Sequence, residues 1–292
     1  MKSGLTPMLL QASQGQYGVA AFNMLNYVTT LGIIKAAESC SSPVIVQTSV
    51  ATVKSIGAEN LIRMVRPMIE AANVPVTLHL DHCQSVEMCK HCIDLGWDSI
   101  MFDGSHLSLK ENIEATNEVR RYAVPRGVNV EGEVGIIAGT EDDISHDIAS
   151  LAGFDETMHY IEQTKVDAIA PAVGTAHGVY RGTPKINYEL LERLKNATPC
   201  PIVIHGGTGL EDSVFRHLIS LGASKINIST ALKQVYLQSI RAFLAANPDC
   251  SNPLRLDKHV EESVVEMVST FFHLFGSANK VRIPGEVCYA VA

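Results

Sequence analysis

The stretch VPVTLHLDHCQS, residues 74–85, contains the pattern on which the fold depends. An apolar run that opens at Val74 ends in the polar pair Asp81-His82, and a segment with helical periodicity follows at 85–95. Strands of a parallel sheet are buried on both faces and need not alternate polar and apolar residues, so the run is predicted to be such a strand. A strand followed by a helix is the unit from which parallel α/β folds are built.

The same unit recurs along the chain. Short apolar runs that end in polar or glycine residues lie at 18–23, 43–49, 75–81, 99–104, 129–135, 168–174, 202–207 and 225–230. Helical periodicity lies between most of them, at 29–40, 58–72, 85–95, 109–122, 155–164, 187–196 and 212–221, and again at 231–246 and 261–275. Eight strands alternating with helices predict a (β/α)8 TIM barrel with extra C-terminal helices, as a single domain over residues 1–292. A doubly wound open sheet is the alternative, but no Gly-x-Gly-x-x-Gly follows the first run.

Composition excludes several classes of protein. The 292 residues are 46% hydrophobic and 18% charged, which suits one large core. A net charge of −8 argues against a nucleic-acid or membrane-surface partner. No apolar stretch reaches the roughly 18–20 residues of a membrane span, and no signal peptide is expected. The seven scattered cysteines suit reduced thiols in the cytoplasm better than a disulfide framework.

Three histidines follow predicted strands. In a barrel of this kind the chemistry lies where the strands end, and His82, His177 and His205 come after the third, sixth and seventh strands. One such histidine alone is more often a hydrogen-bonded loop residue, but three at one rim favour a catalytic zinc site that keeps an open position. His79 is predicted to point away from the ligand face and to be structural.

A cysteine-rich segment offers a different metal site. Cys83, Cys89 and Cys92 lie close to His91, which is a zinc-finger-like composition. The spacing after Asp81-His82 is helical, so we expect Cys89 and Cys92 to lie on a helix face instead.

Two glycine-rich segments indicate an anion site. IHGGTG at 204–209 and KINIST at 225–230 follow the seventh and eighth strands, the usual phosphate position in these barrels. Glycine lets backbone N–H groups approach an anion, although two tight turns would use the same residues. AHGVYR at 176–181 adds Gly178 and the cation Arg181. A metal beside a phosphate site suits enolisation next to a carbonyl, with Glu133 or Glu141 as base and 135–153 as a binding loop.

Together these segments resemble the class II, metal-dependent ketose-bisphosphate aldolases of the fructose- and tagatose-bisphosphate type. The resemblance covers nearly the whole chain, and seven motifs occur in the family's order. They are LDH at 80–82, FDGSH at 102–106, VEGEVG at 130–135, GTEDD at 139–143, GTAHGVYRG at 174–182, HGGTGL at 205–210 and KINIST at 225–230.

The resemblance implies a role for each matching residue. The zinc ligands would be His82, His177 and His205, and a second divalent metal ion would use Asp103 and Glu133. Asp81 would handle the proton on the aldehyde oxygen, and Glu141 would take a proton from dihydroxyacetone phosphate. The implied substrate-binding residues are Asn23, Gln47, Ser49, Gly178, Arg181, Gly206, Gly207, Thr208, Asn227, Ile228, Ser229, Thr230 and Arg255. A monovalent cation and a homo-oligomer, dimer or tetramer, are further implications.

One departure from the family leaves the far end of the substrate open. Many members carry an acidic residue followed by Pro-Arg after the last barrel helix, whereas this chain has Asn252-Pro253-Leu254-Arg255. The resemblance therefore implies cleavage of a ketose 1,6-bisphosphate, through a zinc-stabilised enediolate, to dihydroxyacetone phosphate and an aldehyde. The same chemistry on a different ketose 1-phosphate, a barrel hydrolase and a non-catalytic phosphosugar-binding barrel are the alternatives.

Overall fold

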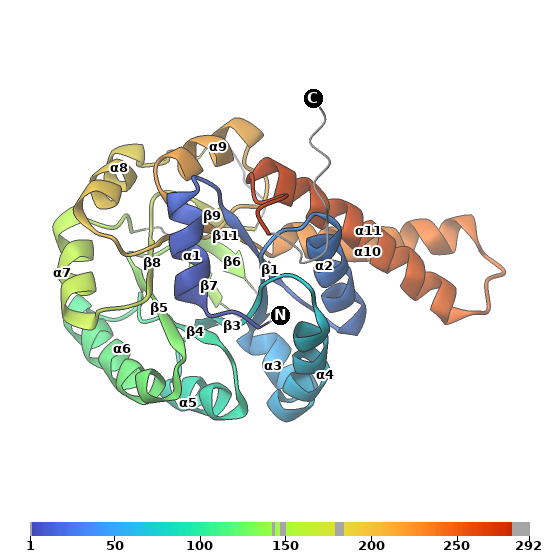
Figure 1. The fold of residues 1–292 in the computed structure, drawn as a ribbon, viewed down its shortest axis with the longest axis horizontal. Coiled ribbons are helices and arrows are strands. Elements are labelled where there is room, and N and C mark those ends of the chain that lie inside the picture. Colours follow the sequence, from blue (N-terminus) through green and yellow to red (C-terminus); the bar gives the residue numbers. More distant parts are fainter. Residues whose placement is uncertain (1, 142–143, 147–149, 179–183, 282–292) are drawn as a thin grey trace.

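A closed barrel of eight parallel strands forms the centre of the molecule (Figure 1). The computed structural model describes residues 2–141, 144–146, 150–178 and 184–281. In ring order the strands are β1 (Val19–Asn23), β2 (Val44–Ser49), β3 (Val76–Cys83), β4 (Ser99–Phe102), β5 (Asn129–Val134), β8 (Ala168–Pro171), β10 (Ile202–Ile204) and β11 (Ala223–Ile228). β11 pairs with β1 and closes the ring. The predicted (β/α)8 fold is confirmed.

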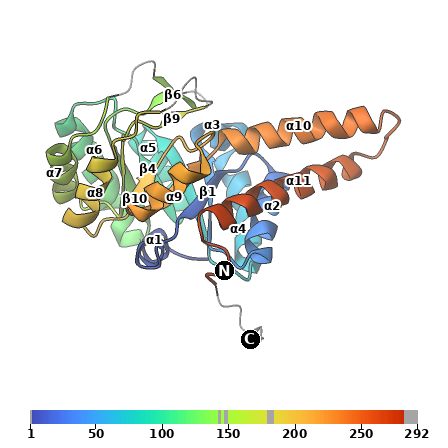
Figure 2. The same ribbon diagram turned by 90° about the horizontal axis from the view of Figure 1, so that it is seen from above.

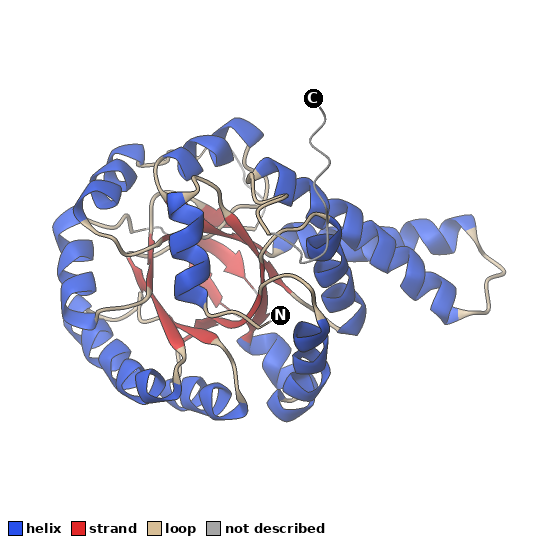
Figure 3. Cartoon of the chain, viewed as in Figure 1, coloured by secondary structure: helices blue, strands red, loops and turns tan. Residues whose placement is uncertain are grey.

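Helices surround the strands on the outside (Figure 3). Those that match predicted helices are α2 (Tyr27–Ser39), α4 (Ala58–Ala71), α5 (Val86–Leu95), α6 (Leu109–Ala123), α7 (Phe154–Thr164), α8 (Tyr188–Ala197), α9 (Asp212–Ser220), α10 (Thr230–Ala246) and α11 (Pro253–Leu274). α11 begins well before the predicted residue 261, because Asn252 caps it and Pro253 suits a first helical position. Three of the described helices were not predicted: α1 (Leu5–Gln14), α3 (Val50–Ile56) and the 3₁₀ helix η1 (Val124–Arg126).

α1 covers the end of the barrel at which the strands begin (Figure 1). Its apolar side chains Leu5, Met8, Leu9 and Ala12 form one buried cluster with residues of four strands, among them Val19 of β1. Among the described residues, α1 therefore closes this end of the barrel interior and leaves the opposite end for a ligand. That opposite end, where the strands finish, is called the mouth from here on.

A small sheet stands at the mouth. It consists of β7 (Ile144–His146), β6 (Ala138–Glu141) and β9 (Ala176–His177) in that order. Figure 2 shows β6 and β9 at the opposite end of the barrel from α1. Gly139 of β6 pairs with His177 of β9, so the predicted binding loop at 135–153 is partly strand and is joined to a candidate ligand.

α10 and α11 form a helical hairpin that projects from the barrel (Figures 1 and 2). α11 packs on both α10 and α2, and it buries Val260, Val264, Val268 and Phe272 along one face. α10 starts at the mouth and has 17 residues, which at about 1.5 Å per residue carries the far end of the hairpin about 25 Å away.

β5 and α7 approach each other closely at Gly132, where there is no room for a larger side chain. A Cβ at this position would lie 2.2 Å from Oη of Tyr160, a fully buried side chain whose hydroxyl is hydrogen-bonded to Thr116. Gly132→Ala is therefore expected to lower the free energy of unfolding by about 1–3 kcal/mol in urea titrations. Gly153→Ala is the control, because its Cβ would meet nothing closer than 3.7 Å. Equal effects of the two substitutions would contradict the close approach.

Candidate active site

His82 faces the mouth because the backbone turns at the end of β3. Its φ is +43°, in the left-handed region, and the pairing of β3 with β4 changes register between Leu80 and Cys83. Adjacent residues of a regular strand point to opposite faces, whereas Asp81 and His82 both contribute to the buried polar cluster at the mouth. A left-handed non-glycine residue costs about 1–3 kcal/mol, and such residues gather at functional sites.

His82, His177 and His205 come together as the sequence predicts. The ring centroid of His82 lies 4.8 Å from that of His177 and 4.6 Å from that of His205. One nitrogen of each ring lies within 4.8 Å of the others, and all three residues are buried. His82 Nε2 is 2.7 Å from His205 Nδ1. Three convergent imidazoles are a donor set that zinc accepts in catalytic sites.

Two carboxylates determine which ring nitrogens point at each other. Asp103 Oδ2 lies 3.0 Å from His82 Nδ1, and Glu131 Oε1 lies 2.8 Å from His205 Nε2. An ionised carboxylate can only accept hydrogen bonds, so these two nitrogens carry the hydrogens. His82 Nε2 and His205 Nδ1 are left facing the shared centre, which is also how carboxylate-bound histidines are oriented in known metal sites.

Burial and neighbouring charges favour one positive charge at this centre. Burial and the charge of His82 lower the pKa of His177 and of His205, which keeps both rings neutral. Burial also opposes protonation of His82, but Asp81 and the hydrogen bond to Asp103 outweigh it and raise the pKa of His82 well above its usual value. The surroundings therefore stabilise a cation where the three histidines meet.

The residues predicted for a second metal ion form an adjoining cluster. His82, Asp103 and Glu133 bring their donor atoms within 4.8 Å of one another, and all three are buried. Burial and the nearby Asp103 carboxylate raise the pKa of Glu133 well above its usual value. Two carboxylates this close repel each other unless a proton or a cation lies between them.

Amide side chains hold Asp81 at the mouth. Asn23 Nδ2 donates to Asp81 Oδ2 at 2.8 Å, and Asn227 Nδ2 donates to Oδ1 at 3.1 Å. Gln47 Nε2 donates to Asn23 Oδ1 at 2.9 Å. Burial would raise the pKa of Asp81, but the charge of His82 and its neighbours outweighs burial and lowers the pKa to about 2. Asp81 is thus an oriented carboxylate that can accept a proton.

A hollow beside the histidines brings together most of the predicted anion-binding residues. Ser229 lies at the N-terminus of α10, makes no capping hydrogen bond, and its Oγ has no hydrogen-bond partner among the described residues. Gly206 has a φ of +73°, and a Cβ there would lie 2.4 Å from the carbonyl oxygen of Ala176. A helix N-terminus with free N–H groups favours phosphate. The lining residues are His177, Gly178, Gly206, Gly207, Thr208, Asn227, Ser229 and Thr230.

The remaining predicted residues are placed differently. Ser49 lies at the mouth, but its hydroxyl caps α3 by accepting from the backbone of the third residue on. Ile228 has its side chain in the hydrophobic core, so only its backbone can meet a ligand. Arg255 is exposed in the first turn of α11, at the far end of the hairpin. Arg181 and the side chain of Glu141 lie outside the described residues.

A charged layer beneath the histidines was not predicted. Lys225 Nζ lies 2.8 Å from Glu131 Oε2, and His79 Nε2 lies 3.6 Å from the same oxygen. All three side chains are fully buried. His79 therefore points into the barrel, which corrects its expected direction. Each residue lies two positions before a predicted site residue on its own strand, so the period-two alternation of strands could have found all three.

The cysteine-rich segment belongs to the core. Cys89 and Cys92 lie on the buried face of α5, as expected, and pack in the main hydrophobic cluster. Within the described ranges, neither group of side chains close enough to hold a metal ion includes a cysteine. The zinc-finger alternative therefore has no support.

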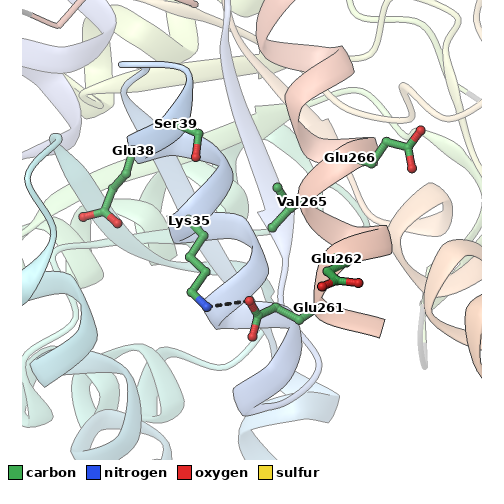
Figure 4. A pocket seen from close by; sticks show the side chains of 7 residues that line it. All are labelled: Lys35, Glu38, Ser39, Glu261, Glu262, Val265 and Glu266. Carbon is green, nitrogen blue, oxygen red and sulfur yellow. Dashed lines mark hydrogen bonds and ion pairs between the residues drawn. The ribbon is translucent and has the colours of Figure 1, made fainter. Parts of the chain in front are cut away.

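An acidic hollow on the outer surface contrasts with the mouth. It measures about 420 Å³, lies between α2 and α11, and is lined by four glutamates together with Lys35 (Figure 4). Lys35 forms an ion pair with Glu261, and both side chains are partly exposed. Surface ion pairs of this kind contribute little, and the hollow has none of the buried, convergent donors found at the mouth.

Known proteins resemble the chain over almost its full length. The model of the family "Fructose-bisphosphate aldolase class-II" matches residues 3–280. A fructose-bisphosphate aldolase of Geobacillus stearothermophilus is 37% identical over 94% of this chain and 96% of its own. A sulfofructosephosphate aldolase of Alkalicoccus urumqiensis is 35% identical over 96% and 98%. A 6-phospho-5-dehydro-2-deoxy-D-gluconate aldolase of Halalkalibacterium halodurans is 37% identical over 94% and 96%. The crystal structure of the YdjI aldolase from Escherichia coli K12, 32% identical, has a TM-score of 0.86 and covers 97% of this chain and 100% of that one.

Proposed function

Because the chain belongs to the class II fructose-bisphosphate aldolase family, we propose that it reversibly cleaves a ketose 1,6-bisphosphate of the fructose or tagatose type. The products would be dihydroxyacetone phosphate and an aldehyde, and the whole chain would act as one domain. The observation that carries the proposal is the convergence at one mouth of three histidine nitrogens, the Asp81 carboxylate and the N-terminus of α10.

The donor set fits a zinc ion. His82 Nε2, His205 Nδ1 and a nitrogen of His177 would hold it, because carboxylates occupy the other nitrogens of the first two rings. Zinc, when bound, is a Lewis acid that polarises the substrate carbonyl and stabilises the negative charge developing on its oxygen. Asp103 and Glu133 would hold a second divalent ion, and a monovalent cation stays a prediction.

Two acids would divide the proton transfers. In cleavage, Asp81 would accept the proton of the hydroxyl that becomes the aldehyde, and in condensation it would return that proton. Its two hydrogen bonds, from Asn23 and Asn227, orient the carboxylate for this task. Glu141 would exchange the proton on the reactive carbon of dihydroxyacetone phosphate. β6, which ends at Glu141, pairs with the strand that contains His177, and this pairing supports the assignment.

The hollow beside His177 would bind the phosphate of the dihydroxyacetone phosphate half. Gly206 and Gly207 line this hollow, and the backbone N–H groups at Gly207 and at the N-terminus of α10 would supply donors without a formal charge. The Ser229 hydroxyl adds a buried donor. Arg181 would add the cation, and its planar guanidinium suits two phosphate oxygens at once.

A cleavage screen tests the proposed function. Ketose 1-phosphates and ketose 1,6-bisphosphates would be supplied with and without a chelator, and release of dihydroxyacetone phosphate would be measured. Metal-dependent cleavage of a bisphosphate is expected. Cleavage confined to a monophosphate would favour the related reaction on another ketose, whereas binding without turnover would favour a phosphosugar-binding barrel.

Arg255 is the proposed partner of an anionic group at the end of the substrate away from the dihydroxyacetone phosphate half. The names of the three relatives each combine one phosphate with a second acidic group, which is a phosphate, a carboxylate or a sulfo group. An anionic far end is therefore supported. α10 carries the hairpin about 25 Å from the mouth, so Arg255 would reach a substrate only at the mouth of a second copy.

Arg255→Ala is expected to lower kcat/KM for the bisphosphate about tenfold or more and to leave that for the ketose 1-phosphate unchanged. The reason is that a charged hydrogen bond contributes roughly 1.5–3 kcal/mol. Steady-state kinetics on both substrates measure the difference, and Arg241→Ala, another exposed arginine of the hairpin, is the control. Equal effects on both substrates, or none, would remove Arg255 from the site.

The protein would also form a homo-oligomer and would be located in the cytoplasm. The hairpin exposes Leu237, Leu244 and Leu254 at 48%, 49% and 71% of their surface, which supports a homo-oligomer formed through this hairpin. All cysteines of the described part are free thiols, which supports a cytoplasmic location. No described helix is long and apolar enough to cross a membrane.

A further inference from the structure

The proposed function assigns no role to Glu131, although this acidic residue contacts one of the three histidines directly. It lies on β5 and is fully buried. One carboxylate oxygen, Oε1, accepts from His205 Nε2 at 2.8 Å. The other, Oε2, accepts from Lys225 Nζ at 2.8 Å. Both oxygens of one carboxylate are thus committed, one to a candidate metal ligand and one to a buried cation.

The burial of the Glu131–Lys225 ion pair is energetically costly. Removing two charges from water costs several kcal/mol for each ion, and apolar residues of similar volume often serve stability as well or better. Lys225 reaches Glu131 across the barrel interior, from β11 to β5, where apolar side chains would otherwise fill the space. A buried ion pair is therefore weak support for a purely structural role, and the contact with His205 offers a functional one.

The contact has a chemical consequence for His205. A neutral imidazole carries its hydrogen on one nitrogen and a lone pair on the other. Glu131 accepts at Nε2, so the lone pair of His205 lies on Nδ1, the nitrogen 2.7 Å from His82 Nε2. In the opposite tautomer Nδ1 would carry the hydrogen and could not bind a metal ion. The Lys225 ammonium keeps the second oxygen of Glu131 occupied, so the first stays directed at His205.

We propose that Glu131, anchored by Lys225, is a positioning residue that fixes the tautomer and orientation of His205 and thereby raises the affinity of the three-histidine centre for zinc. The inference rests on the proposed function, because it takes zinc as the ion that the histidines bind. It assigns Glu131 no contact with substrate.

Glu131→Gln tests the inference. An amide replaces one of the two carboxylate oxygens with an NH2 donor, so either His205 or Lys225 would face a donor in place of its acceptor. Loss of a hydrogen-bond partner of a metal-bound histidine typically costs about 10–100-fold in metal affinity, and that is the expected loss of zinc affinity here. Competition with a chromophoric chelator measures it on the full chain. In the metal-free protein, ¹⁵N NMR of the labelled histidines is expected to show the Nε2–H tautomer of His205 in the wild type and a mixture in the variant.

Two further proteins keep the test decisive if Glu131→Gln does not fold. The double variant Glu131→Leu with Lys225→Met removes both buried charges at similar volume, so it should fold and still lose about 10–100-fold in zinc affinity. Asp98→Asn is the matched control. Asp98 is also a buried carboxylate and pairs with Arg66 at 3.0 Å, but its contacts lie at the opposite end of β3 from the mouth. Its substitution should lower stability and leave zinc affinity unchanged.

The outcomes separate the inference from the proposed function. Zinc affinity within about twofold of wild type in a folded variant would overturn the inference, as would a single Nε2–H tautomer of His205 in the folded double variant. Loss of the fold in both variants, with Asp98→Asn folded, would also overturn it, because the pair would then serve the fold. If the wild type itself fails to bind zinc, the proposed function fails, while the tautomer of the metal-free protein still decides whether Glu131 positions His205.

Discussion

Chelation is expected to abolish aldol cleavage by this protein, and added zinc is expected to restore it. The three histidines provide the only assigned means of stabilising charge on the substrate carbonyl oxygen. A Lewis acid contributes several kcal/mol at such a centre, and about 1.4 kcal/mol corresponds to a tenfold change in rate, so a loss of at least about 10³-fold is expected. The measurement is dihydroxyacetone phosphate release after dialysis, with the metal content of each sample determined in parallel.

His205→Ala should reproduce this loss without a chelator, because it removes one ligand and the ring that Glu131 orients. His217→Ala is the matched control, since His217 lies on α9 and stacks on Tyr188 at the surface. Borohydride treatment in the presence of substrate should leave activity intact, because no lysine is assigned a covalent role. Full activity in protein shown to contain no metal would exclude the metal-dependent reaction.

Asp81→Ala should separate the two halves of the reaction. Ketose cleavage is expected to fall about 10²–10⁴-fold, the usual cost of removing a general acid or base. Proton exchange at the reactive carbon of dihydroxyacetone phosphate should largely persist, because Asp81 serves the other product. Deuterium exchange followed by NMR and the cleavage assay measure the two activities on one preparation. Zinc content must be checked as well, because Asp81 adjoins His82, one of the three proposed metal ligands.

Glu141→Ala, unlike Asp81→Ala, is expected to slow the proton-exchange reaction. Loss of the base should slow proton exchange on dihydroxyacetone phosphate, and cleavage should slow with it because the same carbon must be reprotonated. Ketose cleavage near the wild-type rate in Asp81→Ala would remove Asp81 from its assigned role. Equal retention of exchange in both variants would instead show that Glu141 is not the base.

The barrel and most of its mouth could be predicted because parallel strands leave a strong local pattern. Each strand is a short apolar run followed by polar residues, and the carboxyl ends of such strands meet at one rim. His82, His205 and Asn227 could therefore be assigned to a common site from their positions at or near the ends of these runs. The hollow at the α10 N-terminus followed from glycines and hydroxyl residues placed where phosphate is usually bound.

Other features depend on tertiary structure and leave little local signal. α1 was not predicted, and its apolar face has a partner only in the tertiary structure, where it covers one end of the barrel. Pro7 lies in its first turn, where proline is tolerated. The left-handed conformation of His82 has no signature in its neighbours. The inward direction of His79, Glu131 and Lys225 follows from strand alternation, but the contacts that they make with one another depend on the closed ring, since the three lie on different strands.

The pairing of β1 with β11 also delays closure of the barrel during synthesis on the ribosome. Synthesis delivers β1 near the start and β11 only after most of the chain, so a nascent chain keeps two unpaired sheet edges until residue 228 has left the ribosome. Asn227 holds Asp81 from 146 residues further along the chain, so catalytic competence should arise in the same late step. Chains truncated before β11 would be inactive and, with open edges exposed, prone to aggregate or to be degraded.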